Sequence, residues 1–120
     1  METERIRLLV DLEIHDGKFS DFEALAREMV AVSKQEAGTL NYKFYLSADR
    51  KQCRLVEGYT GQAAITEHFQ GRTVQHFVPQ LVQFCTPKRM EFYGEPGAEV
   101  TAMAKHFGAE IFTAWEGFDR

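Results

Sequence analysis

The sequence is poor in cysteine and proline, has no long apolar run and carries no concentrated positive charge. Only Cys53 and Cys85 occur in 120 residues, far apart and without CxxC spacing. This excludes a disulfide framework and argues against a zinc site, so we expect two free thiols and no bound metal. Apolar stretches of a few residues exclude a membrane-spanning helix.

The charge distribution and the N-terminal residues indicate the class of partner and the cellular compartment. The formal net charge is −4, and basic residues are scattered apart from the pair Lys88-Arg89. A nucleic-acid-binding protein usually carries a concentrated basic stripe, so we expect no nucleic-acid partner. Residues 1–5 are charged and lack the apolar stretch of a signal peptide, which predicts a cytoplasmic protein without a membrane partner.

Apolar and aromatic residues are well represented. Residues of the hydrophobic class make up 44% of the chain, and ten of them are Phe. A chain of 120 residues suits one domain with one substantial core. The abundance of Phe indicates a wide aromatic core, an apolar cavity or an apolar interface.

Hydrophobic periodicity predicts the elements. Alternating apolar residues from Ile6 to Ile14 indicate a strand. A helix is expected from about residue 21 to 36, with Ser20 and Glu23 as a capping box and Gly38 as C-terminal cap. The same rules predict strands at 40–46, 53–59 and 88–93, and helices at 61–69 and 73–84, the last kinked at Pro79 or regular only from Val78.

The resulting order is strand, helix, strand, strand, helix, strand. This is the ferredoxin-like split βαβ arrangement of an α+β protein, in which helices cover one face of the sheet. We assign it to residues 1–94. The chain is too short to supply a second layer for the other face, so we expect a second copy to cover it in a homodimer.

Residues 95–120 form a C-terminal extension beyond this unit. Val100, Met103, Ala104 and Phe107 are spaced as on one face of a helix, and an extended segment follows at 111–115. Because the extension has an apolar face and contains Trp115, the only Trp, we expect it to dock on its own domain or on the dimer partner.

Four short motifs, in order, resemble those of the antibiotic-biosynthesis monooxygenase (ABM) superfamily. Residues 36–42, EAGTLNY, resemble its "E-x-G-T/C-x-x-Y" turn, and residues 57–59, EGY, resemble "E-x-W/Y". Residues 64–68, AITEH, and 75–77, QHF, resemble "A-x-x-x-H" and "H-F". The likeness spans about residues 5–93. Within the family, the chain most resembles the small quinol-monooxygenase members.

The resemblance implies a dimeric α/β barrel, with two sheets face to face and one pocket per subunit between helices and sheet. It also implies catalysis without a flavin, metal or other cofactor. The haem-degrading members use an Asn on the first strand and a Trp in the helical region. The first strand here has no Asn and Trp115 lies in the tail, so haem degradation is disfavoured.

Two histidines and one glutamate are the candidate catalytic residues. His68 can exchange protons near neutral pH, although a helix histidine bonded only to backbone or solvent is the alternative. His76 lies just before Pro79, where helix regularity is interrupted, but it also fits a polar surface position. Glu57 lies mid-strand and therefore pairs with a partner such as Arg54 or Arg7, faces a wet cavity, or has a raised pKa.

Candidate substrate-binding residues are Asn41, Tyr42, Tyr59 and Phe77. Asn41 can bond a substrate oxygen or its own backbone, and the two tyrosines can donate to an oxyanion or lie in the core with satisfied hydroxyls. Phe77 is a candidate for the wall of an aromatic-binding pocket.

These residues fit more than one function. One is a cofactor-independent monooxygenase that oxidises a small electron-rich aromatic such as a quinol, with a histidine removing the phenolic proton. An isomerase or tautomerase of a small hydroxy-ketone is the second, for which Arg72 and Lys43 are the available phosphate-binding hints. The third is a non-catalytic dimer that binds a small molecule, since one fold supports unrelated functions.

Overall fold

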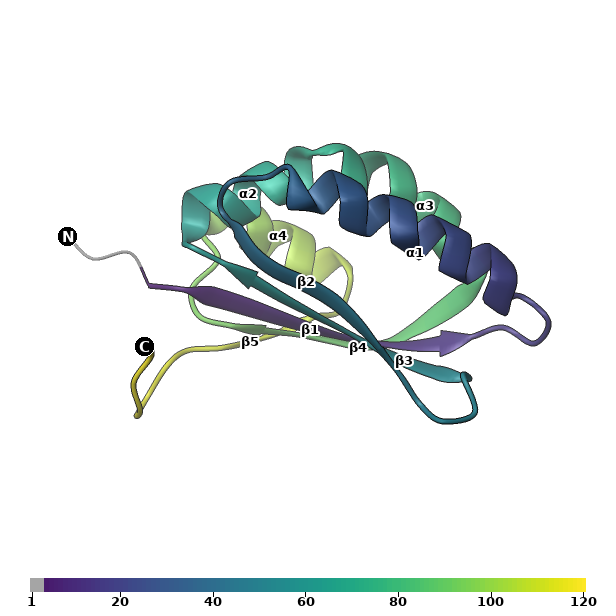
Figure 1. Cartoon of the computed structure of the whole chain (residues 1–120). Coiled ribbons are helices and arrows are strands. Elements are labelled where there is room, and N and C mark those ends of the chain that lie inside the picture. The colour runs from purple at the N-terminus through teal and green to yellow at the C-terminus, as the bar shows by residue number, and fades with distance from the viewer. Residues whose placement is uncertain (1–3) are drawn as a thin grey trace.

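The computed structural model describes residues 4–120 as one sheet covered by helices on one face (Figure 1). The six predicted core elements are present in the predicted order, which confirms the ferredoxin-like α+β fold. The strands are β1 (Ile6–Ile14), β2 (Thr39–Leu46), β3 (Gln52–Tyr59), β4 (Cys85–Tyr93) and β5 (Glu110–Phe112). The helices are α1 (Phe19–Lys34), α2 (Gln62–Gln70), the π-helix η1 (Thr73–Phe77), α3 (Val78–Leu81) and α4 (Ala98–His106).

The sheet has the order β2-β3-β1-β4-β5. All neighbours are antiparallel except β4 and β5, which run parallel. Leu8 of the central strand pairs with Glu57 on β3 and with Phe92 on β4. Glu57 therefore lies in the middle of the sheet, on the face that the helices cover.

The core lies between this face and the helices. The predicted alternation of β1 is confirmed, because the five apolar residues at every second position from Ile6 to Ile14 are all buried. Helix α1 contributes Phe22 and Met29, and α2 contributes Ile65 and Phe69. Burying side chains of this size on both layers supplies the main driving force for folding.

The predicted ends of α1 are wrong. The helix begins at Phe19 after Lys18, and no side chain of residues 4–120 caps it. Glu23 pairs with Arg27 at 3.1 Å instead of closing a capping box with Ser20. At the other end Gln35 is the cap, so Gly38 is not.

The interruption near Pro79 takes the second of the predicted forms. A π-helical turn covers Thr73–Phe77, and regular α-helix begins at Val78 with Pro79 in its first turn, where the missing N–H costs nothing. The hydroxyls of Thr73 and Ser33 lie 3.0 Å apart and are both buried, which joins the turn to α1.

Strand β4 begins three residues earlier than predicted. Cys85 pairs with Ile14, and Pro87 pairs with Leu12. The register then shifts so that Asp11 faces Arg89, which leaves Lys88 as the extra residue of a β-bulge.

Helix α4 and strand β5 pack against the rest of the same chain. Val100 and Ala104 of α4 are buried, and β5 lies beside β4. The chain beyond β5 forms a protruding loop (Figure 1) whose end returns to β1 through the ion pair of Asp119 with Arg7. Trp115 and Phe118 in this loop are 93% and 79% exposed.

Among residues 4–120 no helix lies over the second face of the sheet, and this face is not simply apolar. Leu9 and Val56 pair on this face, next to Asp11, which forms ion pairs with Arg54 at 2.9 Å and Arg89 at 3.3 Å. Within residues 4–120 no helix is both long and apolar enough to cross a bilayer.

Candidate active site

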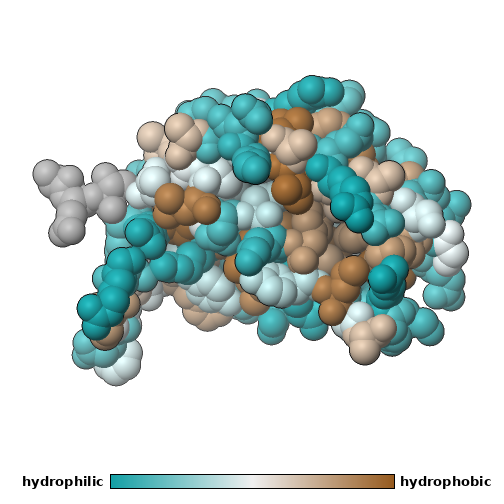
Figure 2. Space-filling model, in the orientation of Figure 1, coloured by the Kyte–Doolittle hydropathy of each residue, from teal (hydrophilic) through white to brown (hydrophobic). Residues whose placement is uncertain are grey.

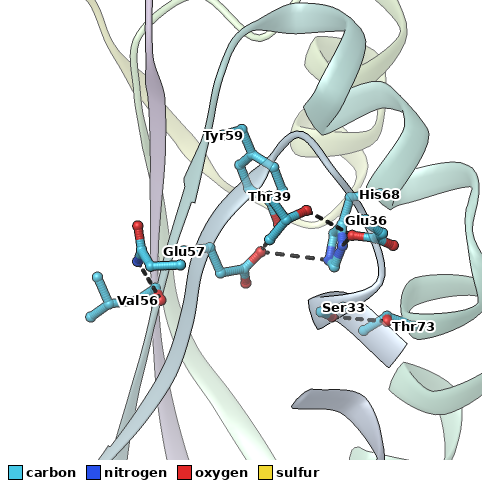
Figure 3. A network of polar contacts seen from close by, with 9 residues as sticks. Ser33, Glu36, Thr39, Val56, Glu57, Tyr59, His68 and Thr73 are labelled. Carbon is cyan, nitrogen blue, oxygen red and sulfur yellow. Dashed lines mark hydrogen bonds and ion pairs between the residues drawn. The ribbon is translucent and has the colours of Figure 1, made fainter. Parts of the chain in front are cut away.

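A buried polar cluster lies where β2, β3 and α2 meet (Figure 3). Glu57 and Tyr59 point from β3 toward the helices because strand residues two apart share a face. Tyr42 on β2 pairs directly with Glu57. His68, on α2, completes the cluster, and its side chain is 2% exposed.

His68 lies between two glutamates. Its Nδ1 is 2.7 Å from Oε1 of Glu36, in the turn between α1 and β2. Its Nε2 is 3.7 Å from Oε1 of Glu57, which is longer than a hydrogen bond but close enough for a charge interaction whenever His68 is protonated. The Tyr59 hydroxyl donates to the same Glu57 oxygen, and the Thr39 hydroxyl donates to Glu36 at 2.7 Å.

Aromatic rings enclose the imidazole. The ring centroids of Tyr42, Tyr59 and Phe69 lie 5.4, 5.2 and 5.9 Å from that of His68. Tyr42, Tyr59 and Phe69 are themselves buried. The rings exclude water and fix the plane of the imidazole, so proton positions in the cluster depend on the two carboxylates.

Burial changes the acidity of the groups around His68. It raises the pKa of Glu57 to about 7; the charge of Glu36 adds to this, while the charge of His68 and the Tyr59 hydrogen bond oppose it. Burial also raises the pKa of Tyr42 and that of Tyr59 well above the ordinary value, helped by the nearby carboxylates. Glu57 is therefore able to accept and donate a proton near neutral pH.

Glu57 opens onto a cavity of about 370 Å³ between the sheet and the helices. The wall is mostly apolar, with Leu55, Phe69 and Val78 among its residues, and Glu57 and Tyr42 are polar groups in it. His68 does not line this cavity. The group that reaches a ligand there is Glu57. His68 lies on the side of Glu57 away from the cavity and contacts Glu36 in turn.

Two basic residues line the same cavity, and they are not the predicted ones. The β4 bulge places Lys88 in the wall, next to Arg89, which is engaged in ion pairs with Asp11 and Glu91. The Arg72 guanidinium instead stacks 5.0 Å from the Phe77 ring centre, and Lys43 lines a different hollow.

That second hollow is a groove of about 570 Å³ between α1 and β2. Apolar side chains gather in it below α1, as Figure 2 shows. It is more open than the cavity and reaches neither Glu57 nor His68, although Tyr42 contributes to both walls. Its position makes it the weaker candidate for chemistry despite its size.

Three predicted site residues lie outside the cluster. His76 is exposed on η1, and Phe77 is buried without lining the cavity. The Asn41 amide donates to the Val56 carbonyl at 3.2 Å. The Asn41 side chain also lies against Gly58, where an added Cβ would be 2.1 Å from the Asn41 Oδ1. Because Asn41 and Gly58 alternate with Tyr42 and Glu57, the Asn41 side chain lies on the opposite face of the sheet.

Sequence reasoning missed Glu36 and misjudged the partners of Glu57. Arg54 pairs with Asp11, and Arg7 pairs with Asp119. The segment Glu36-Ala37-Gly38-Thr39 was available as part of a motif, and its Glu–Thr spacing is what brings the Thr39 hydroxyl to the Glu36 carboxylate. Within the described part of the chain, no group of three or more His, Cys, Asp or Glu is arranged to hold a metal ion.

The chain shares its fold with several solved proteins. MupZ from Pseudomonas fluorescens is 16% identical with a TM-score of 0.84, covering 98% of this chain and 96% of that one. Rv0793 from Mycobacterium tuberculosis is 20% identical with a TM-score of 0.69, covering 79% of this chain and 98% of its own. SnoaB, a cofactor-independent oxygenase from Streptomyces nogalater, is 11% identical with a TM-score of 0.67, covering 80% and 97%.

The coverage separates these structures. The likeness to MupZ includes the C-terminal extension, whereas a fifth or more of this chain lies outside the likeness to the other two. No curated protein matches the sequence. Residues 5–80 match the family described as antibiotic biosynthesis monooxygenase, which is more than half of the chain. The chain is therefore a member of the antibiotic biosynthesis monooxygenase family.

Proposed function

We propose that this protein is a cofactor-independent monooxygenase that oxidises a small electron-rich aromatic such as a quinol, with Glu57 as the catalytic base. The observation that carries the proposal is Glu57 itself, a carboxylate with a pKa raised to about 7 that faces an apolar cavity of about 370 Å³. Family membership and the likeness to SnoaB, an oxygenase without a cofactor, support the reaction class.

The chemistry needs only a base and a water-poor cavity. Glu57 removes a phenolic proton, and the electron-rich anion passes one electron to dioxygen. The resulting superoxide and aromatic radical combine into a C–O bond, and the proton returns to the peroxide. Loss of water leaves a hydroxyquinone, so that a quinol and O₂ give a hydroxyquinone and H₂O. Tyr42 lines the cavity beside Glu57, where its hydroxyl can donate to the developing oxyanion.

This proposal moves the role of base from histidine to glutamate. His68 supports Glu57 without reaching the cavity, and His76, being exposed on η1, has no part in the mechanism. Lys88 in the cavity wall favours substrates with an acidic substituent. The same base on a hydroxy-ketone would give the isomerase alternative, which consumes no oxygen.

We also propose that the working form is a homodimer. In the part of the chain that the structure describes, helices cover one face of the sheet, and the other face presents Leu9 and Val56. The ring centroids of Tyr93 and Phe112 lie 5.8 Å apart, and both rings are partly exposed. A second copy would cover these groups. Light scattering at micromolar concentration is expected to give twice the chain mass, and a monomer mass would contradict the dimer.

Oxygen uptake tests the reaction. We expect wild-type protein, without added metal or flavin, to consume oxygen above autoxidation with at least some members of a panel of plain and carboxylated hydroquinones. Glu57→Gln should lower the rate by about a hundredfold or more, because the base is lost while the shape is kept.

His76→Ala is the matched control and should behave like wild type. Uptake that depends on His76 and not on Glu57 would overturn the assignment of the base. No uptake by wild type with any member of the panel would overturn the monooxygenase proposal in favour of an isomerase or a binding protein.

A further inference from the structure

We propose that Glu36 is a positioning residue of this site: it holds His68 so that Nε2 faces Glu57 as a proton acceptor, and it stabilises the imidazolium that forms there. The inference rests on the proposed function, in which Glu57 is the base. In this proposal His68 holds the substrate proton while dioxygen reacts. None of the motif-based expectations gave Glu36 a role.

The hydrogen bonds of Glu36 determine the tautomer of His68. An ionised carboxylate can only accept hydrogen bonds, so the 2.7 Å contact between Glu36 Oε1 and His68 Nδ1 requires a hydrogen on Nδ1. Neutral imidazole carries one hydrogen, and Nε2 is then an unprotonated acceptor. The Thr39 hydroxyl donates to Oε1 at 2.7 Å and holds the Glu36 carboxylate in place.

The acceptor nitrogen faces the base. Nε2 lies 3.7 Å from Glu57 Oε1, and a shift of less than an ångström would make this contact a hydrogen bond. After Glu57 takes a proton from the substrate, the proton moves to the Nε2 lone pair. Glu57 becomes a carboxylate again, His68 becomes an imidazolium, and no other bond changes.

This transfer has a chemical use. While the proton stays on Glu57, the phenolate beside it can recapture it before dioxygen reacts. A proton on His68 is one residue further from the substrate, because His68 does not line the cavity. The proton then returns from His68 through Glu57 to the peroxide. The ionisable groups that face His68 are Glu36 before β2, Tyr42 on β2, and Glu57 and Tyr59 on β3.

A simple structural ion pair would make different demands. If Glu36 and His68 formed only a structural ion pair, both side chains would have to stay charged, and His68 would need no particular tautomer. Side-chain exposure is 15% for Glu36, 2% for His68 and 4% for Glu57, so water screens the charges of this cluster little, including the charge that His68 carries once it is protonated. The neutral variant Glu36→Gln keeps the size of the side chain and removes the charge that fixes the tautomer.

Nitrogen NMR of the histidine rings tests the positioning role without any substrate. In ¹⁵N-histidine-labelled wild type, with His68 assigned by its loss in His68→Asn, we expect hydrogen on Nδ1 and none on Nε2 at mildly alkaline pH. Glu36→Gln should allow the Nε2–H tautomer to appear, while Glu36→Asp should restore the wild-type tautomer in part. Glu67→Gln, an exposed neighbour of His68 on α2, is the control and should change nothing.

Kinetics on the same variants test the effect on turnover. Glu36→Gln should lower kcat of oxygen uptake by about tenfold. It should leave KM within about twofold, because Glu36 does not touch the cavity. Thr39→Val is a milder variant that keeps the carboxylate and should give a smaller loss, which covers the case that Glu36→Gln fails to fold.

The two proposals fail in different ways. A wild-type His68 with hydrogen on Nε2, or a tautomer and kcat that do not respond to Glu36→Gln, would overturn the role of Glu36 and leave the monooxygenase proposal standing. The expected tautomer without oxygen uptake from any phenol would support the positioning of His68 and overturn the oxidation reaction.

Discussion

Glu57 is a carboxylate in an apolar wall, and its proton affinity depends on named neighbours. Burial favours the neutral acid, and Glu36 reinforces that tendency, whereas His68 and the Tyr59 hydroxyl stabilise the anion. The balance leaves the pKa of Glu57 at about 7. Such a group can exist in either form under cellular conditions, which is the property that general acid–base catalysis requires.

The raised pKa of Glu57 predicts a pH-dependent stability. A group whose folded pKa exceeds its ordinary value of 4.5 stabilises the fold fully below pH 4.5, and this contribution is lost as pH rises through about 7. Glu57→Gln cannot lose a proton, so its free energy of unfolding should rise relative to wild type across that interval, by up to about 3 kcal/mol. Urea denaturation at a series of pH values measures the difference, and a flat difference would contradict the raised pKa.

Some of the site was predictable at the residue scale. Glu57 follows from a carboxylate in an alternating strand, and His68 from a titratable side chain in a family motif. Their link to Glu36 was not predictable, because Glu36 is 32 residues from His68 in the chain. Only the packing of the α1–β2 turn against α2 brings the two together.

At the scale of elements, regular alternation predicted the strands well, and local capping rules predicted the helix ends poorly. Helix α1 starts earlier than predicted because Phe19 packs against the core. The Arg50 guanidinium lies 4.9 Å from the centre of the Phe19 ring. Strand β4 was predicted too short, and the part that was missed contains Pro87. In the sheet Pro87 lies next to the bulge, where a missing N–H is tolerated.

Gly38 positions the helix that carries His68. A Cβ added there would lie 2.4 Å from the Ala64 Cβ on α2, so only glycine allows α2 to approach the start of β2. Gly38→Ala should lower the free energy of unfolding by roughly 1–3 kcal/mol and reduce oxygen uptake by displacing His68. Denaturation and oxygen uptake measure the two effects.

A double-mutant cycle tests the cause of that loss. Ala64→Gly removes the opposing methyl group and should recover part of the stability in the Gly38→Ala background, beyond its own cost in a helix. Strictly additive effects would show that the close approach of the two residues is not what requires glycine.

On the scale of the whole molecule, the order of elements was enough to predict one sheet with one covered face. The pairing of β5 with β4 was not predictable, since a three-residue strand carries almost no pattern. The polar groups of the open face were not predictable either, because the ion pairs of Asp11 with Arg54 and Arg89 join residues from three strands.

Two truncations separate the roles of the C-terminal extension. Ending the chain after Gly94 removes Val100 and Ala104 from the core, so the free energy of unfolding should fall by at least roughly 2 kcal/mol. Ending it after Phe112 removes only the tail with Trp115 and Phe118, both exposed here. That truncation should leave the monomer fold intact and weaken the dimer. Thermal melts and light scattering over a concentration series distinguish the two effects, and unchanged melting and mass in both would contradict a docked extension.

The most direct test of the central claim is a carbon NMR titration of the Glu57 carboxyl in the wild-type protein, assigned by comparison with Glu57→Gln. We predict that this carbon titrates near pH 7, well above an ordinary glutamate, and that its shift responds to a phenol added to the cavity. A titration near pH 4.5 with no response to the phenol would show that Glu57 is an ordinary carboxylate and would contradict its role as the base.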